Sequence, residues 1–146
     1  MGGAFGFEVS HEFLEGDVVV VRVVGDVDVY TFAALRAYLN KILGAGVVPR
    51  HVGLDTSGCE FWDSTAFGVL VGFAKSFREV REGGVLAFVS PPEWMLKMLK
   101  ITGLEKPFPV VQGTDGLLAW LADFEAGADS LVGAEESCGP RDESVN

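Results

Sequence analysis

The strongest constraint on the fold is a run of valines near the amino terminus. Residues 18–24 read Val-Val-Val-Val-Arg-Val-Val, which is almost continuous in β-branched side chains. Such side chains favour extended backbone, and a run without alternating polar positions is typical of a strand that is buried on both faces. We therefore expect this segment to lie in the interior of a sheet.

The flanking segments predict an α/β fold. Residues 5–14 alternate more nearly between apolar and polar and meet the valine run through Glu15–Gly16, which indicates an antiparallel hairpin with a half-exposed edge strand. Further strands are predicted at residues 52–54, 85–89 and 107–110, and helices at 31–43, 64–82, from 90 and from 114. We expect a single domain, a mixed sheet of about five strands with about four helices packed on it.

Length and composition indicate one domain followed by a tail. The chain has 146 residues, of which 49% are hydrophobic, enough for one sizeable core. Beyond residue 122 acidic residues far outnumber the single Arg141 and few apolar residues remain. We expect the domain to span residues 1–122 and residues 123–146 to form an acidic, disordered tail.

Charge and targeting signals narrow the range of partners and locations. The formal net charge of −10 argues against nucleic acid or an anionic membrane as a partner, because both repel such a surface. The amino terminus lacks the basic region of a signal peptide, and no apolar run approaches the length that spans a bilayer. These features predict a cytoplasmic protein.

A polar cluster, Asp63-Ser64-Thr65, stands where an apolar strand region passes into an apolar-striped helix. A Ser or Thr there can cap the free backbone N–H groups of the helix, and the same N–H groups favour an added phosphate. Gly68 and Gly72 follow on one face of that helix, and each costs about 1 kcal/mol relative to alanine. That face either packs closely on the rest of the fold or docks a partner.

Four segments resemble the STAS domain of bacterial anti-sigma factor antagonists over residues 17–111. The first is a Gly-Asp-Val-Asp turn at Gly25–Thr31, and the second is the Asp-Ser-Thr loop at Leu54–Thr65. The third is a Gly-Gly strand start at Gly83–Val89, and the fourth is a closing Thr-Gly-Leu and Phe-Pro signature at Ile101–Val110. The resemblance implies a phosphorylation-controlled binding module. The unmodified form binds an anti-sigma factor kinase, a histidine-kinase-like ATPase that uses ATP-Mg, and thereby frees a sigma factor; a serine phosphatase resets the phosphorylated form.

The resemblance also implies roles for individual residues. In the family the serine directly after the aspartate receives the phosphate, which implies Ser64, and Asp28, Asp63 and Thr65 form its surroundings. Two positions depart from the family pattern: Ala66 stands where glycine is usual, and Trp62 is bulkier than the common aliphatic residue. The expected partner-binding surface comprises Trp62, Ala66, Gly68, Val69, Gly72, Lys75 and Ser76.

Other classes of function have weaker support. A Ser-His-Asp hydrolase would need a base for Ser64, but the Gly-x-Ser-x-Gly elbow is missing, and we expect His11 and His51 to be incidental surface residues. Cys59 and Cys138 are far apart, and no phosphate-binding loop or metal-ligand spacing occurs. We therefore expect no catalytic residue, metal or cofactor. A constitutive STAS scaffold or sensor that binds a protein or small ligand, with Ser64 only a cap, remains the alternative.

Overall fold

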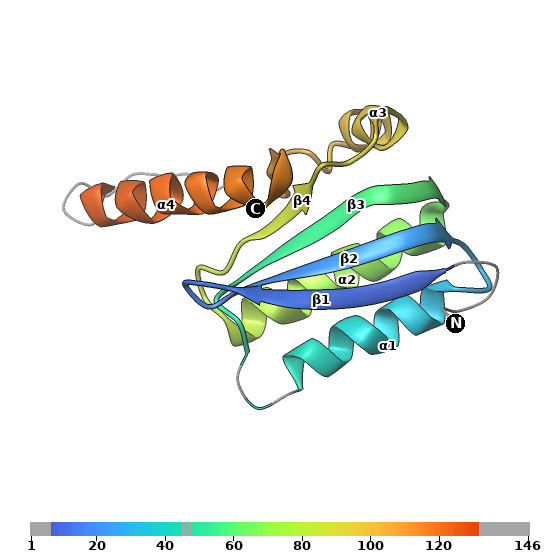
Figure 1. Cartoon of the computed structure of the whole chain (residues 1–146), viewed down its shortest axis with the longest axis horizontal. Helices are drawn as coiled ribbons and strands as arrows, with labels where there is room; N and C mark the ends of the chain where they lie inside the picture. Colours follow the sequence, from blue (N-terminus) through green and yellow to red (C-terminus); the bar gives the residue numbers. More distant parts are fainter. Residues whose placement is uncertain (1–6, 45, 47, 132–146) are drawn as a thin grey trace.

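The computed structural model describes residues 7–131 apart from 45 and 47, and within them strands and helices alternate after an opening hairpin (Figure 1). The elements, in chain order, are β1 (Glu8–Leu14), β2 (Val18–Val27), α1 (Phe32–Leu43), β3 (His51–Trp62), α2 (Ser64–Val80), β4 (Leu86–Val89), α3 (Glu93–Thr102), β5 (Val110–Val111) and α4 (Gly113–Leu131). The predicted class, five strands and four helices in a mixed α/β sheet, is confirmed.

The five strands form one sheet in the order β1-β2-β3-β4-β5. β1 pairs antiparallel with β2, whereas β2, β3, β4 and β5 run parallel to one another. Parallel neighbours need crossover connections, and the helices between them supply these. The carboxyl ends of β2 to β5 therefore meet at one edge of the sheet and the amino ends at the other.

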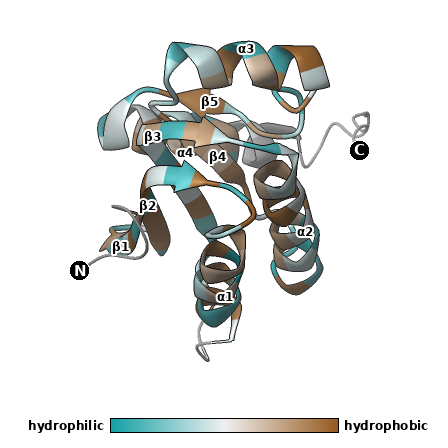
Figure 2. Ribbon diagram, turned by 90° about the vertical axis from the view of Figure 1, so that its right-hand side faces the viewer, coloured by the Kyte–Doolittle hydropathy of each residue, from teal (hydrophilic) through white to brown (hydrophobic). Residues whose placement is uncertain are grey.

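Helices cover both faces of the sheet, as the valine run requires. Val19, Val21 and Val23 belong to the larger core with residues of α1 and α2. Val18 and Val20 point the other way and belong to a second cluster with Leu117 and Leu121 of α4. In Figure 2 the apolar surfaces of α1 and α2 face the sheet from the same side. The prediction of a strand buried on both faces is confirmed.

Strand β3 is longer than the sequence pattern predicted. It runs to Trp62 instead of ending at Leu54, and it stays paired with β2 through two register shifts. Polar side chains in its second half resemble a loop in sequence, but Asp55 accepts a hydrogen bond from the Arg22 guanidinium at 3.2 Å and another from the Ser57 backbone N–H at 2.9 Å. These bonds satisfy the Asp55 carboxylate within the strand, and pairing continues to the start of α2.

Helix α4 also extends beyond the predicted end of the domain. It continues to Leu131, so the first nine residues assigned to a disordered tail, 123–131, are helical. Glu125, within that stretch, bonds to His51 at the start of β3. The prediction of a tail that begins at residue 123 is therefore wrong for this segment, and residues 132–146 lie outside the described part of the chain.

Candidate functional site

Two aspartates meet at the carboxyl edge of the sheet. Val27 at the end of β2 is the register partner of Trp62 at the end of β3, and the Asp63 backbone N–H donates to the Val27 carbonyl at 3.2 Å. Asp28 and Asp63 each follow directly after these paired residues. The structure therefore brings the two predicted carboxylates to adjacent positions, with Ser64 next in the chain.

Asp63, and not Ser64, caps α2. Its backbone is extended (φ −95°, ψ −176°), and its Oδ1 accepts the Ala66 backbone N–H at 3.0 Å. Ser64 is the first residue of the helix and is exposed. Among the described residues its hydroxyl has no hydrogen-bond partner, so the interpretation of Ser64 as the capping side chain is wrong.

The carboxylate of Asp28 holds the turn between β2 and α1. Its Oδ1 accepts the backbone N–H groups of Tyr30 at 2.9 Å and Thr31 at 3.2 Å, and the Thr31 hydroxyl donates to the Asp26 carbonyl at 2.8 Å. Two bonds from backbone N–H groups fix this carboxylate in place. Asp28 is thus a rigid negative group beside the start of α2.

The turn also exposes apolar side chains that the sequence analysis did not select. Tyr30 is 84% exposed and Val29 59% exposed, and Phe61, one residue before the end of β3, is 49% exposed. All three lie in segments that border the carboxyl edge. For Tyr30 the signal in the sequence was an aromatic residue in a predicted turn, where polar residues are more usual.

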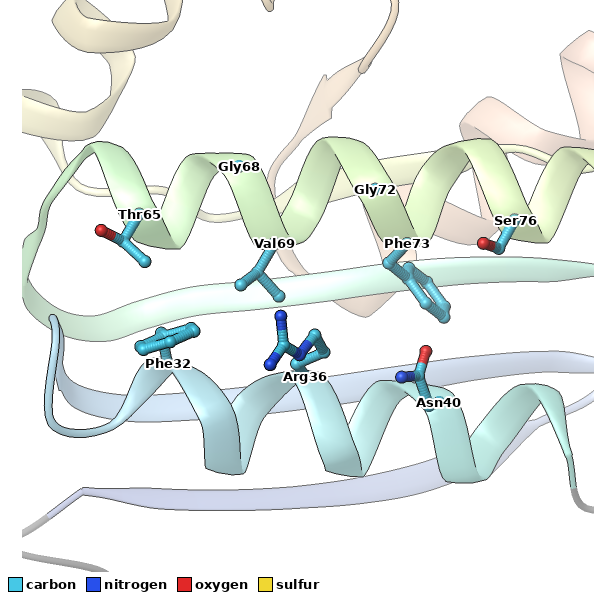
Figure 3. Close-up of a pocket in the computed structure, with 9 residues that line it drawn as sticks. All are labelled: Phe32, Arg36, Asn40, Thr65, Gly68, Val69, Gly72, Phe73 and Ser76. Atoms are coloured by element: carbon cyan, nitrogen blue, oxygen red, sulfur yellow. The ribbon is translucent and has the colours of Figure 1, made fainter.

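A groove separates α1 from α2 and begins beside Ser64 (Figure 3). It has a volume of about 490 Å³ and is lined by Phe32, Arg36, Asn40, Thr65, Gly68, Val69, Gly72, Phe73 and Ser76. Four of the predicted partner-binding residues, Gly68, Val69, Gly72 and Ser76, therefore share one surface with Thr65. Val69 forms part of its floor, being only 9% exposed.

The two glycines of α2 face open space. A Cβ atom built on Gly68 or on Gly72 would meet no atom within 4 Å. Close packing inside the domain therefore does not explain these glycines, and the docking surface stays a prediction. The Arg36 guanidinium lies 5.3 Å from the centre of the Phe32 ring, and no carboxylate lines the groove.

The remaining predicted contact residues lie elsewhere. Trp62 is 3% exposed and Ala66 is fully buried, so their assignment to the partner-binding surface is wrong. Their side chains belong to the core, where the Trp62 ring packs against Phe67 with ring centres 5.2 Å apart. Lys75 lines a separate groove of about 420 Å³ on the other side of α2.

His51 is buried rather than a surface residue as predicted. Its Nδ1 accepts the Val85 backbone N–H at 3.0 Å, and its Nε2 lies 2.7 Å from Oε2 of Glu125, which also bonds to Nε of Arg50 at 2.8 Å. Because Nδ1 accepts, the proton sits on Nε2 and is donated to the carboxylate. This network connects α4 to the sheet. The sequence did not predict it, because His51 and Glu125 are 74 residues apart in the chain.

The geometry rules out a Ser-His-Asp triad. His51 begins β3 and Ser64 follows its end, and the twelve residues of that strand span roughly 36 Å at about 3.3 Å per residue, so the two side chains lie far beyond hydrogen-bonding reach. His11 lies on β1, where Nδ1 bonds to the Tyr38 hydroxyl. Burial raises the pKa of the Cys59 thiol to about 12, so this thiol is not a nucleophile near neutral pH. Among the described residues, no three His, Cys, Asp or Glu side chains gather to hold a metal ion.

Comparison with known proteins places the fold and the site in one family. The family model of the STAS domain matches residues 13–115. The chain belongs to the STAS domain family. The match covers β2 to β5, the groove and Ser64, and it ends just inside α4.

Relatives of this STAS chain include an anti-sigma factor antagonist. The anti-sigma-B factor antagonist of Staphylococcus epidermidis is 31% identical over 99 residues, which cover 68% of this chain and 88% of that protein. An anti-sigma factor antagonist from Mycobacterium paratuberculosis has a similar structure, with a TM-score of 0.67 and 23% identity over 82% of this chain and 97% of the other.

The fold also occurs in proteins other than anti-sigma factor antagonists. A sulfate transporter family protein from Wolinella succinogenes superposes with a TM-score of 0.63 and 17% identity, over 79% of this chain and 93% of that one. In the part of our chain that the structure describes, no helix is long and apolar enough to cross a membrane.

Proposed function

We propose that this protein is an anti-sigma factor antagonist whose binding is switched by phosphorylation of Ser64. The observation that carries the proposal is the unpartnered Ser64 hydroxyl at the exposed start of α2, where Asp63 has taken over the capping role. The similarity to the Staphylococcus epidermidis antagonist supports an anti-sigma factor as the partner. The partner is a serine kinase with a histidine-kinase-like ATPase fold, and it frees a sigma factor when this protein binds it.

The groove between α1 and α2 is the docking surface in this proposal. It begins at Thr65, directly after the acceptor serine, and runs past Gly68 and Gly72 to Ser76. Because both glycines face open space, a partner backbone can approach the α2 backbone closely there. Tyr30 and Val29 extend the apolar contact area beside the serine. A kinase seated in the groove would have Ser64 at its edge.

Phosphorylation acts through charge at the contact in this mechanism. A phosphate adds about −1.5 to −2 charges next to the carboxylates of Asp28 and Asp63, which the backbone holds in place. Like charges brought together across an interface cost several kcal/mol, and about 2.7 kcal/mol already weakens binding a hundredfold. Release therefore requires no change of fold. A serine phosphatase restores the hydroxyl, and the protein itself is a substrate and not an enzyme.

The proposal is tested first by locating the phosphate. Incubation with its anti-sigma factor kinase and ATP-Mg should add one phosphate, which peptide mass spectra should place on Ser64. Ser64→Ala should abolish the added mass, whereas Thr65→Val should retain it, because Thr65 lines the groove and is not the acceptor in this proposal. A phosphate that maps to Thr65, Ser57 or Ser76 would contradict the assignment.

Binding to the same partner tests the switch itself. Ser64→Ala should bind like the parent protein, since it removes only the acceptor oxygen. Ser64→Asp places a permanent charge at the contact and should weaken binding about tenfold, with a larger loss for the phosphorylated protein. Undiminished binding by Ser64→Asp and by the phosphorylated protein, measured by calorimetric titration, would instead favour the constitutive scaffold.

A further inference from the structure

Strand β1 offers a long open edge to a neighbouring chain. It lies at the end of the sheet and pairs with β2 over all seven residues without a register shift. Among the described residues no other strand pairs with its outer side. The opposite edge of the sheet differs, because β5 has two residues only. A long, regular edge strand presents a row of backbone donors and acceptors that can pair with another strand.

Several of the usual protections of an edge strand are missing from β1. It contains no proline, no lysine and no bulge, and its charged residues, Glu8 and Glu12, lie on one face of the sheet. The other face carries Val9, His11 and Phe13, because their register partners on β2 belong to the larger core. Phe13 is nevertheless 64% exposed, and its ring remains uncovered at this edge.

The sequence of β1 is complementary to itself in one antiparallel register. A twofold axis through His11 places all seven residues opposite one another, with Val9 facing Phe13 of the second copy on one side of the sheet. On the other side Glu8 faces Leu14 and Glu12 faces Ser10. An axis through Ser10 would instead set Glu8 against Glu12, and an axis through Glu12 would set that residue against itself. Like charges directly opposite are unfavourable, so the register centred on His11 is preferred.

We propose that two copies of this chain pair through β1, antiparallel about His11, to form a continuous ten-stranded sheet. The Val9–Phe13 contact then covers the exposed Phe13 ring twice per dimer. Ser64 and the α1–α2 groove stay open, since β1 lies on one side of α1 and α2 on the other (Figure 2). The dimer is therefore compatible with one kinase bound to each copy.

Charge makes this association weak and dependent on salt. Each chain carries a formal net charge of −10, and the two Glu12 side chains lie diagonally across the twofold axis. An edge of seven residues also buries an area at the low end for specific interfaces. Salt screens the repulsion between the copies. We expect the dimer to form in the micromolar range and to strengthen with ionic strength.

Substitutions of opposite charge at Ser10 test the register. Ser10→Glu sets a second carboxylate against Glu12 twice per dimer, and Ser10→Lys sets an ammonium group there. Sedimentation velocity of the full chain from about 10 µM to 1 mM should show the dimer dissociation constant raised by Ser10→Glu and lowered by Ser10→Lys. Each shift should be roughly 2- to 30-fold, because two cross-strand pairs change together.

The same position supplies its own control for folding. Within one chain Ser10 faces Arg22 of β2, so Ser10→Glu gains an attractive pair inside the monomer and Ser10→Lys a repulsive one. Any effect on monomer stability therefore runs opposite to the effect on the dimer. A monomer at every concentration and salt level, or a dimer that responds equally to both substitutions, would overturn the proposal.

Hydrogen exchange gives a second, independent readout. On raising the protein concentration, backbone amides within residues 8–14 that point away from β2 should exchange more slowly, while those of α2 should not change. Slowing at α2 or α3 in place of β1 would show that a different surface pairs the copies and would overturn the assignment. Neither measurement involves Ser64 or the kinase, so the outcome is separate from that of the phosphorylation test.

Discussion

Polar side chains at the two ends of the parallel sheet differ in the partners to which they bond. At the amino end, Glu125 bonds to both His51 and Arg50, and Arg81 bonds to Asp17 at 3.0 Å. Their side chains join β3, α4 and the loops into one body. At the carboxyl end, the carboxylates of Asp28 and Asp63 bond, among the described residues, only to groups within three residues along the chain, and Ser64 is exposed.

This difference separates a structural end from a reactive end. Polar groups at the amino end bond across distant segments of the chain, so their loss should destabilise the fold. At the carboxyl end two aspartates make the backbone rigid and present one free oxygen, so the loss of that oxygen should leave the fold unchanged. Measurements of the unfolding free energy of variants at the two ends can therefore test this difference.

The largest expected effect follows from His51→Ala. It leaves the buried Val85 N–H without an acceptor, opens a cavity and frees Glu125 from the sheet. We expect a loss of about 3 kcal/mol in the free energy of unfolding, measured by urea denaturation. Ser64→Ala is the matched change at the other end and should stay within about 0.5 kcal/mol. Equal losses in the two variants would remove the distinction.

A gain in stability is expected from the double substitution Gly68→Ala and Gly72→Ala. Each added methyl group has open space around it, and alanine in a helix interior is favoured over glycine by about 1 kcal/mol. The unfolding free energy should rise by about 1 to 2 kcal/mol while binding to the anti-sigma factor weakens. Gly83→Ala is a useful contrast, because φ is +82° there and the change should destabilise.

The sequence predicted one end of the molecule better than the other. Local signals, namely the hairpin, the helix spacing and the Asp-Ser-Thr cluster, identified the order of elements and the position of Ser64. The His51–Glu125 contact joins residues that are 74 positions apart in the sequence, and local sequence patterns do not predict such a bond. The extent of β3 was missed for a similar reason, since Arg22 on another strand satisfies Asp55.

Details at the carboxyl end were also beyond the sequence. Asp63 and Ser64 are both good capping residues, and only the helix geometry decides that Asp63 has the role. Trp62 and Ala66 belong to the same motif as Ser64, but strand alternation and the helix turn direct them into the core. A motif can thus contain reactive and buried positions side by side, and the fold separates them.

A smaller effect should distinguish the two neighbours at the start of α2. Asp63→Ala removes the acceptor of the Ala66 N–H and should cost about 1 kcal/mol. Asp63→Asn and Asp63→Ser keep a capping oxygen and should recover most of that loss in thermal melts. If Ser64→Ala proved the more destabilising change, the serine would be the cap and its hydroxyl would not be free.

The smallest expected effect is a dependence on pH at the amino end. The hydrogen bond from His51, followed by the charge of Arg50, lowers the pKa of Glu125 below its ordinary value of 4.5 in the folded state. A depressed carboxyl pKa adds stability above the unfolded value, and that stability is lost as pH falls through the folded one. Glu125 is 40% exposed, so solvent limits the contribution to about 0.5 kcal/mol.

Glu125→Gln isolates this contribution. The amide oxygen still accepts from His51 but does not titrate, so the stability difference from the parent protein should be greatest at pH 6 to 7. It should shrink as pH falls below about 4.5. Glu82 and Glu125 both line one cavity at this end of the molecule, and among the described residues Glu82 has no hydrogen bond or ion pair. Glu82→Gln is therefore the control, and its stability difference from the parent protein should vary less with pH. Because the carboxylate anchors α4 only while it is charged, a difference for Glu125→Gln that did not vary with pH would mean that packing, and not the ionic bond, holds the helix.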